Sequence, residues 1–309
     1  MTRLLPSMRA LAFGCAMAWL GTAVLGQAAA RPWKTPRTAW DDPDLQGFWT
    51  NIGESFTPLE RPVSMGTRTV INDAEWQERL AAYNRMANGR SEVAPPSRQA
   101  SRIIDPPNGR FPPLTPEGVR RAAALKAAEA RMEGPEDAPL YTRCMTRGIL
   151  TMLPTFSNQH YEIVQSPGWV AILYEHVRVV RTIPLDGRPH VDDAIRTWMG
   201  DPRGRWEGDT LVVETTNFRD GTLDAGFVAS DALRVVERFR RTSASGMEWQ
   251  ATLTDPTMYT APVTVSLPLT RDLETDQILE YACHEGNERI LEMKLSTARW
   301  KEREAPKAK

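Results

Sequence analysis

The chain has 309 residues, of which 25% are charged, and its formal net charge is −1. This balance gives no surface suited to nucleic acid or to an acidic membrane, so we expect neither as a partner. The length fits one large domain, or one domain with an added N-terminal segment.

The first 30 residues are typical of a cleavable signal peptide. Arg3 and Arg9 make a short basic start, and residues 10–24 are almost wholly apolar. Alanines at 28–30 supply the small residues that signal peptidase requires. The apolar run is shorter than the roughly 20 residues that cross a bilayer, which disfavours the alternative of a membrane anchor.

A cysteine inside the apolar run leaves a second alternative, because Cys15 is a candidate lipoprotein site. Phe13 fits that kind of site poorly, and the apolar run continues beyond the cysteine. We therefore expect cleavage before Arg31 and a mature protein in the periplasm or outside the cell, without stable insertion into a membrane.

After cleavage the mature chain keeps two cysteines, Cys144 and Cys283. In an oxidising compartment they are expected to form one disulfide. Closing a loop of about 140 residues contributes roughly 4–5 kcal/mol in the chain-entropy model, less any strain. The alternative is a pair of metal-binding or catalytic thiols, although neither has a second cysteine at metal-ligand spacing.

Residues 31–140 are predicted to form an N-terminal arm with two helices. Asn72 or Asp73 is a suitable cap for the first helix. The second helix begins with Thr115 as its cap and Pro116 at its first position. The segment between the helices must be extended and irregular, because it contains Pro95, Pro96, Pro106, Pro107, Pro112 and Pro113.

Residues 141–300 are predicted to form a mainly β domain, followed by a charged tail over 301–309. Short β-rich runs follow one another with turn residues between them, which favours an antiparallel up-and-down meander. The meander closes as a barrel or, alternatively, folds as a sandwich. The predicted strands are Tyr161–Ser166, Trp169–Val180, Thr210–Phe218, Leu233–Thr242, Met247–Thr254, Val263–Leu269 and Gln277–Ala282.

Common catalytic motifs are absent from the sequence. It has no glycine-rich dinucleotide motif, no P-loop and no nucleophile elbow, and the pair His284-Glu285 lacks the second histidine of a zinc protease motif. We therefore expect no cofactor and no resident metal. A metal-dependent variant that uses His190, His284 and Glu285 as ligands stays open as an alternative.

Histidines are the first candidates for proton transfer, because imidazole both takes and gives a proton near neutral pH. His190 lies in a long polar connection between two predicted strands, and such connections often hold sites. His284 and Glu285 follow Cys283, so a disulfide would hold them stiffly. The alternative for His190 is a turn histidine bonded to the backbone. The alternative for His284 and Glu285 is a strand end with a structural role only.

Strand alternation indicates which side chains face the core. On the strand 233–241, Glu237 shares a face with apolar residues, while its neighbours on the other face are charged. A carboxyl in such surroundings needs a partner, and Arg181 or Arg178 is available to supply it. On the strand 210–218, Asn217 shares a face with Leu211, Val213 and Thr215. The buried pair is either structural or orients a ligand.

Four motifs resemble signatures of a large family of exported bacterial proteins. They are DPDLQGFW at 42–49, IPLDGRPH at 183–190, GDPRGRWEGDTLVV at 200–213 and EYACHEGN at 280–287. The resemblance implies a lipocalin-like β-barrel with an N-terminal helical arm, and it implies no particular reaction. Gly47-Phe48-Trp49 also resembles the Gly-x-Trp that precedes the lipocalin meander.

These features predict an exported, cofactor-independent enzyme of the lyase, decarboxylase or isomerase type. It would act by proton transfer on a small apolar oxygenated or phenolic compound. His190 and His284 would exchange protons and Glu285 would orient them. The substrate-binding candidates are Arg181, Asn217 and Glu237. The alternatives are a periplasmic lipocalin-like carrier of a hydrophobic small molecule, and an envelope structural protein without a cavity.

Overall fold

A computed structural model describes residues 33–304, apart from 88–93, 157–158, 223–226 and 274–276. Residues from Lys34 onward form one compact unit. The predicted signal peptide and Cys15 lie outside the described residues. In the described part of the chain, no helix is long and apolar enough to cross a membrane.

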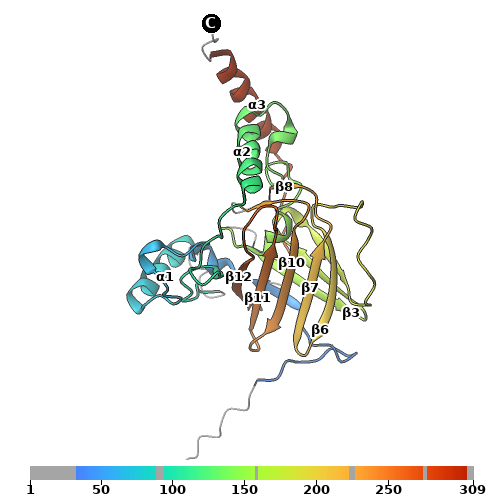
Figure 1. Cartoon of the computed structure of the whole chain (residues 1–309). Helices are drawn as coiled ribbons and strands as arrows, with labels where there is room; N and C mark the ends of the chain where they lie inside the picture. Colours follow the sequence, from blue (N-terminus) through green and yellow to red (C-terminus); the bar gives the residue numbers. More distant parts are fainter. Residues whose placement is uncertain (1–32, 88–93, 157–158, 223–226, 274–276, 305–309) are drawn as a thin grey trace, which may run out of the picture. The chain divides into compact units, whose positions relative to one another are not determined.

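A ten-stranded antiparallel sheet forms the centre of the described unit (Figure 1). Its hydrogen-bonded order is β5-β4-β3-β1-β12-β11-β10-β7-β6, and β2 pairs with β12 outside this path. The strands are β1 Gly47–Thr50, β2 Ile103–Asp105, β3 His160–Ser166, β4 Trp169–Tyr174, β5 Val180–Pro184, β6 Asp201–Glu207, β7 Thr210–Thr216, β10 Arg234–Arg241, β11 Gly246–Thr254 and β12 Val263–Arg271. A separate short hairpin consists of β8 Gly221–Thr222 and β9 Val228–Ala229.

The sheet is an up-and-down barrel that is nearly closed. Because β1 pairs with both β3 and β12, consecutive strands of the path are neighbours all the way round, except where β5 meets β6. At that gap a Cβ on Gly204 of β6 would lie 2.7 Å from Ile183 and 2.5 Å from Leu185. Because Gly204 has no side chain, β5 and β6 can approach each other at the gap. The mainly β meander predicted from the sequence is confirmed.

Large side chains on the inner faces of the strands fill the barrel. Burial alternates along β10 and β11 with the period of two that a half-buried strand requires. Burying each large apolar side chain contributes roughly 1.5–3 kcal/mol. The largest fully buried side chains of this core include Trp49, Trp249, Tyr161, Tyr174, Phe218, Phe227 and Phe239. The interior of the barrel is therefore a packed core.

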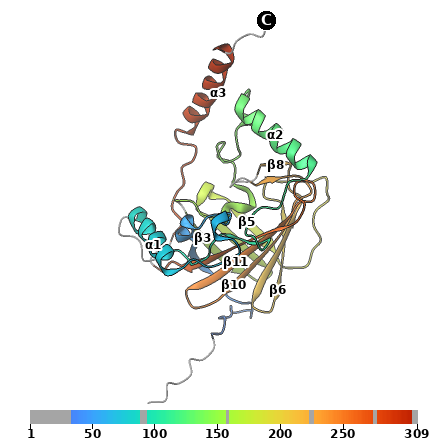
Figure 2. The same ribbon diagram turned by 60° about the vertical axis from the view of Figure 1, so that its left-hand side comes forward.

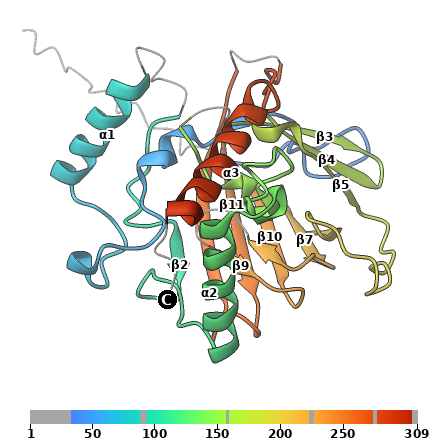
Figure 3. The same ribbon diagram turned by 90° about the horizontal axis from the view of Figure 1, so that it is seen from above.

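Helices lie around the barrel, with α1 beside it and α2 and α3 over one of its ends (Figures 2 and 3). The α-helices within the described residues are α1 Asp73–Ala87, α2 Pro116–Arg131 and α3 Asn287–Glu304. The 3-10 helices there are η1 Ile52–Phe56, η2 Val63–Met65, η3 Pro135–Asp137, η4 Gly148–Met152 and η5 His176–Arg178.

The two helices predicted in the arm are confirmed, together with their caps. The Asn72 side chain accepts a hydrogen bond from the backbone N–H of Glu75, and the Glu75 side chain accepts one from Asn72 N–H, which makes a capping box. Thr115 accepts from Gly118 N–H at the start of α2. The helix ends at Met132, whose φ of 49° is left-handed.

Two strand predictions are wrong. The run 169–180 breaks into β4 and β5, because Val177 and Arg178 turn the chain with φ values of 63° and 48°. A β-branched residue seldom adopts that conformation, so no turn residue marked the break. Residues 277–282 form no strand and lead by turns into α3. Both sides of β12 are already paired, by β1 and β11, so the segment that follows β12 finds no free edge on that strand.

The C-terminal segment also differs from its prediction. α3 runs from Asn287 to Glu304, so the first part of the predicted charged tail, 301–304, is helical. Residues 305–309 lie outside the described residues. An amphipathic helix at this end of the chain was not predicted.

Candidate functional site

The predicted disulfide is confirmed. Cys144 and Cys283 are bonded, with their Cα atoms 5.7 Å apart. The bridge joins the segment that follows η3 to the turn that precedes α3. It therefore holds the two parts of the chain that lie over the end of the barrel, and its presence is consistent with export.

The predicted partner of Glu237 is Arg181, inside the barrel. Arg181 Nη2 lies 2.5 Å from Glu237 Oε2, and the two side chains are 2% and 0% exposed. Trp249 Nε1 donates a hydrogen bond of 3.0 Å to the other carboxylate oxygen, and Arg181 donates one of 2.7 Å to Thr215 Oγ1. The substrate-binding candidates Arg181 and Glu237 therefore form an internal ion pair held by core side chains.

Two opposing effects set the protonation of this pair. Burial lowers the pKa of Arg181, but the facing Glu237 carboxylate outweighs it and the net direction is upward. Tyr174 packs beside Arg181, and burial raises its pKa to about 12. The guanidinium therefore stays charged and the phenol stays protonated at neutral pH.

His190 lies on the outer side of the barrel wall. Its Nδ1 atom is 3.1 Å from Asp201 Oδ2, and its Nε2 atom is 3.9 Å from Glu214 Oε1. Thr215, which follows Glu214 on β7, is fully buried and contacts Arg181 inside the barrel. Because neighbouring strand residues point to opposite faces, the wall separates His190 from the internal ion pair.

Asp201 orients the imidazole of His190. Its Oδ2 atom also accepts a 2.9 Å hydrogen bond from Val191 N–H, and Arg203 donates to its other oxygen. Burial opposes the charged carboxylate, but these hydrogen bonds outweigh it and lower the pKa of Asp201. A carboxylate on Nδ1 leaves Nε2 as the nitrogen that can exchange a proton.

Asn217 shapes the loop that carries His190. Its φ is 58°, and its side-chain Nδ2 donates to the backbone oxygens of Val191, Asp192 and Ile195 at 3.3, 3.0 and 3.1 Å. The amide of this substrate-binding candidate is thus committed to the loop backbone.

His284 and Glu285 lie exposed in the turn before α3. Among the residues described, no hydrogen bond or ring contact joins His284 to His190, and no group of three or more His, Cys, Asp or Glu side chains is arranged to hold a metal ion. The structure therefore does not bring together the three catalytic candidates, which were His190, His284 and Glu285.

A third histidine, which the sequence did not single out, lies between two buried carboxylates. His160 Nδ1 is 3.0 Å from Glu175 Oε2, and Nε2 is 3.1 Å from Asp272 Oδ2. Burial lowers the pKa of His160, but the two carboxylates outweigh it and raise the pKa overall; the pKa of Glu175 is lowered. Since both ring nitrogens contact a carboxylate, the protonated form of His160 joins Glu175 to Asp272 as a charged clamp.

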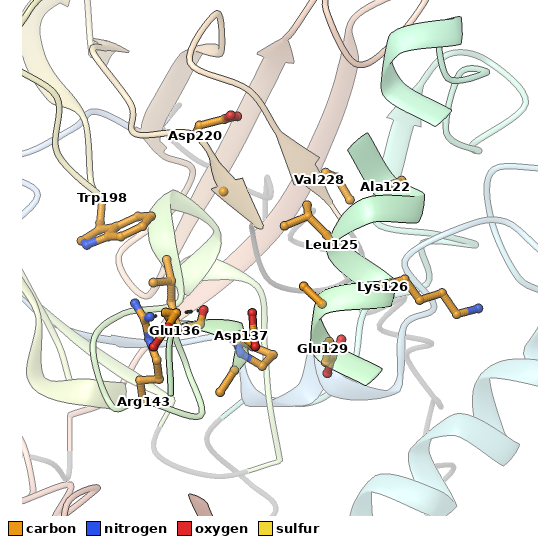
Figure 4. A pocket seen from close by; sticks show the side chains of 15 residues that line it. Ala122, Leu125, Lys126, Glu129, Glu136, Asp137, Arg143, Trp198, Asp220 and Val228 are labelled. Atoms are coloured by element: carbon orange, nitrogen blue, oxygen red, sulfur yellow. Dashed lines mark hydrogen bonds between the residues drawn. The ribbon is translucent and has the colours of Figure 1, made fainter. Parts of the chain in front are cut away.

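Two clefts lie beside the segment that contains Cys144. The first, which we call the helix cleft, has a volume of about 400 Å³ and lies between α2, η3 and the β8–β9 hairpin (Figure 4). The second, the tyrosine cleft, has a volume of about 380 Å³ and includes Tyr141, Tyr281 and Glu285 in its lining. Both volumes fall in the range of small-molecule sites.

In comparisons with known proteins, no family model and no curated protein matches the chain. These comparisons therefore assign no family to the chain, and its function has to be argued from the geometry of the sites.

Proposed function

We propose that the protein is an exported carrier or binding protein for a hydrophobic small molecule, and that the ligand occupies the helix cleft. The observation that carries this proposal is a cleft of about 400 Å³ that combines apolar side chains with a charged, mainly acidic part, which includes Glu129, Glu136, Asp137, Arg143 and Asp220. The barrel interior is an unsuitable place for the ligand, because large side chains pack it. The site is thus assigned to the end of the barrel.

Part of the wall of the helix cleft consists of apolar side chains, which suit the apolar part of a ligand. Ala122 and Leu125 of α2 lie beside Val228, and Trp198 lies on the opposite side of the cleft (Figure 4). The small alanine side chain leaves room beside Leu125. Lys126 points away from the cleft, so its charge stays in solvent (Figure 4). An apolar ligand would be shielded from water here, which drives binding.

Polar groups gather at one part of the cleft and would hold the polar end of a ligand. Asp137 accepts hydrogen bonds from the backbone N–H groups of Glu133 and Gly134, so its carboxylate is fixed in place. Arg143 donates to the backbone oxygen of Glu136. These fixed donors and acceptors favour a hydrophobic molecule with one polar end.

Export and family membership belong to the same proposal. The basic and apolar N-terminus, the alanines at 28–30 and the Cys144–Cys283 disulfide all support export to an oxidising compartment. The four sequence motifs and the up-and-down barrel support membership of the exported family with a lipocalin-like barrel.

Binding of N-phenyl-1-naphthylamine, a hydrophobic fluorescent probe, tests the proposed site in the mature protein. Ala122→Phe fills the cleft and is expected to weaken binding about tenfold. Ala124→Phe is the matched control, because Ala124 is exposed on the same helix and does not line the cleft. Equal affinities of the two variants, or no saturable fluorescence change with the unsubstituted protein, would sink the proposal.

A second candidate function is proton-transfer catalysis at His190, which the Asp201–His190 hydrogen bond favours. Here Nε2 of His190 would be the general base. Assaying a panel of phenolic carboxylic acids for decarboxylation tests it, and His190→Gln is expected to lower the rate by at least about a hundredfold. Full activity in this variant, or no turnover of any member of the panel, excludes the candidate.

A further inference from the structure

We propose that the tyrosine cleft is a second binding site, which takes a small, neutral, planar aromatic molecule that carries a hydrogen-bond acceptor. This site is separate from the helix cleft: residues 138–140 and 143 line the helix cleft, whereas 141 and 142 line the tyrosine cleft. The proposal rests on the fixed walls, the ring surfaces, the free hydroxyl proton and the balanced charge of the cleft.

Three contacts fix the walls of the tyrosine cleft relative to each other. The Cys144–Cys283 disulfide joins them covalently. Asn287 Nδ2 donates a 2.6 Å hydrogen bond to the backbone oxygen of Thr142. The Tyr141 and Tyr281 hydroxyl oxygens lie 2.9 Å apart. A site whose walls are already held in place loses little entropy when it binds a ligand.

Stacked rings present flat surfaces to the cleft. The buried imidazole of His176 packs against both tyrosine rings, with centroid distances of 4.6 Å to Tyr281 and 5.2 Å to Tyr141, and with both rings inclined to it by 30° or less. Tyr141 is nevertheless 40% exposed, and Ile290, on the α3 side of the cleft, is 47% exposed. A planar aromatic molecule between Tyr141 and Ile290 would cover both.

The tyrosine pair leaves one hydroxyl proton available. Each phenol has a single O–H, and the bond between Tyr141 and Tyr281 uses one of the two protons. Burial and the bond to Tyr141 raise the pKa of Tyr281 to about 12, so the Tyr281 hydroxyl keeps its proton at neutral pH. No described residue accepts the second proton. A carbonyl or ether oxygen of a ligand would accept it.

The charges at the cleft cancel. Glu285 and Lys294 both line it, both are exposed, and they carry opposite charges. The two side chains therefore give no net charge that would attract a cation or an anion, and a charged ligand would lose hydration on entering the cleft. This balance favours a neutral molecule over an ion.

Fluorine NMR of the full mature chain, labelled with 3-fluorotyrosine, tests the site. The chain has six tyrosines, and Tyr141→Phe and Tyr281→Phe assign the two resonances of interest. Acetophenone serves as the probe: it is neutral and planar, has a carbonyl acceptor, and is of a size that binds in about the millimolar range. We expect saturable shifts of these two resonances, and at least about threefold weaker binding of benzoate and of 1-cyclohexylethanone.

A pair of variants on α3 separates specific binding from general association. Ile290→Gln is expected to weaken acetophenone binding roughly fivefold, because Ile290 lines the cleft. Met293→Gln is the control, since Met293 is 63% exposed and does not line it; its affinity should stay within about twofold. The proposal is overturned if the two variants bind alike, if no saturable shift occurs up to about 20 mM, or if only other tyrosine resonances move.

Discussion

Arg181 Nη2 lies 2.5 Å from Glu237 Oε2 at a point where neither side chain reaches solvent. The ion pair joins β5 to β10 across the packed interior of the barrel. Two charges in such a place stabilise the fold only as a pair, because each one alone would have to give up its hydration without compensation.

Glu237→Gln is therefore expected to lower the free energy of unfolding by about 3–5 kcal/mol, because it leaves the Arg181 charge buried without its counter-ion. Urea denaturation of the mature protein measures the loss. Glu248→Gln is the control: Glu248 of β11 pairs with Arg240 of β10 on the exposed face of the same hairpin. Loss of this surface pair should lower the free energy of unfolding by less than about 1 kcal/mol. Equal losses in the two variants would show that the internal pair has no special role.

The His160 clamp predicts how stability depends on pH. The pKa of His160 is raised above its ordinary 6.5 in the folded protein. The clamp therefore contributes its full stability below about pH 6.5 and loses it as the pH rises through the raised folded pKa. Glu175 has a lowered pKa, so its contribution is lost only as the pH falls through that lower folded value.

Urea midpoints measured between about pH 5 and 9 test this prediction, since the linkage of protons to folding sets the slope. In the unsubstituted protein the midpoint should fall on the alkaline side, and His160→Gln should flatten that fall. His284→Gln serves as the control, because His284 is exposed in the turn before α3. A slope that His284→Gln removes and His160→Gln keeps would contradict the clamp.

Local rules were enough to predict much of the barrel. Alternation along a strand depends only on neighbouring residues, so it identified Glu237 as inward-facing, and the cost of burying a charge then required a partner such as Arg181. The caps at Asn72 and Thr115 likewise depend on residues within one turn. The disulfide followed from the count of cysteines once the signal peptide was set aside.

Features that depend on the closing of the sheet could not be predicted from the sequence. His160 and Asp272 are 112 residues apart in the chain, and only the pairing of β1 with both β3 and β12 brings their ends together. The strand predicted at 277–282 matched a local pattern, but both sides of β12 were already paired. The clefts arise from helices and loops that meet over the barrel end, which no local spacing encodes.

The gap between β5 and β6 makes Gly204 intolerant of a side chain. Gly204→Val would drive its methyl groups into Ile183 and Leu185, because a Cβ at this position would already lie within 2.7 Å of both side chains. Overpacking of this kind costs typically 1–3 kcal/mol, and thermal unfolding followed by circular dichroism measures it. Gly208→Val provides the contrast, since a Cβ there meets open space, although its φ of 60° adds backbone strain. Wild-type stability of Gly204→Val would refute close packing at the gap.

Removal of the disulfide should affect the clefts more than the barrel. The Cys144→Ser, Cys283→Ser double variant frees the segment 138–144, which contributes different residues to the two clefts. Among the described residues, the Tyr141–Tyr281 and Asn287–Thr142 hydrogen bonds also join this segment to the C-terminal part of the chain. Loss of a native disulfide costs typically 2–5 kcal/mol. Because the aromatic core lies inside the barrel, its near-ultraviolet circular dichroism should persist at low temperature, while binding of N-phenyl-1-naphthylamine and of acetophenone weakens at least about threefold. If both molecules bind the double variant as tightly as the oxidised protein, the bridge does not organise the clefts.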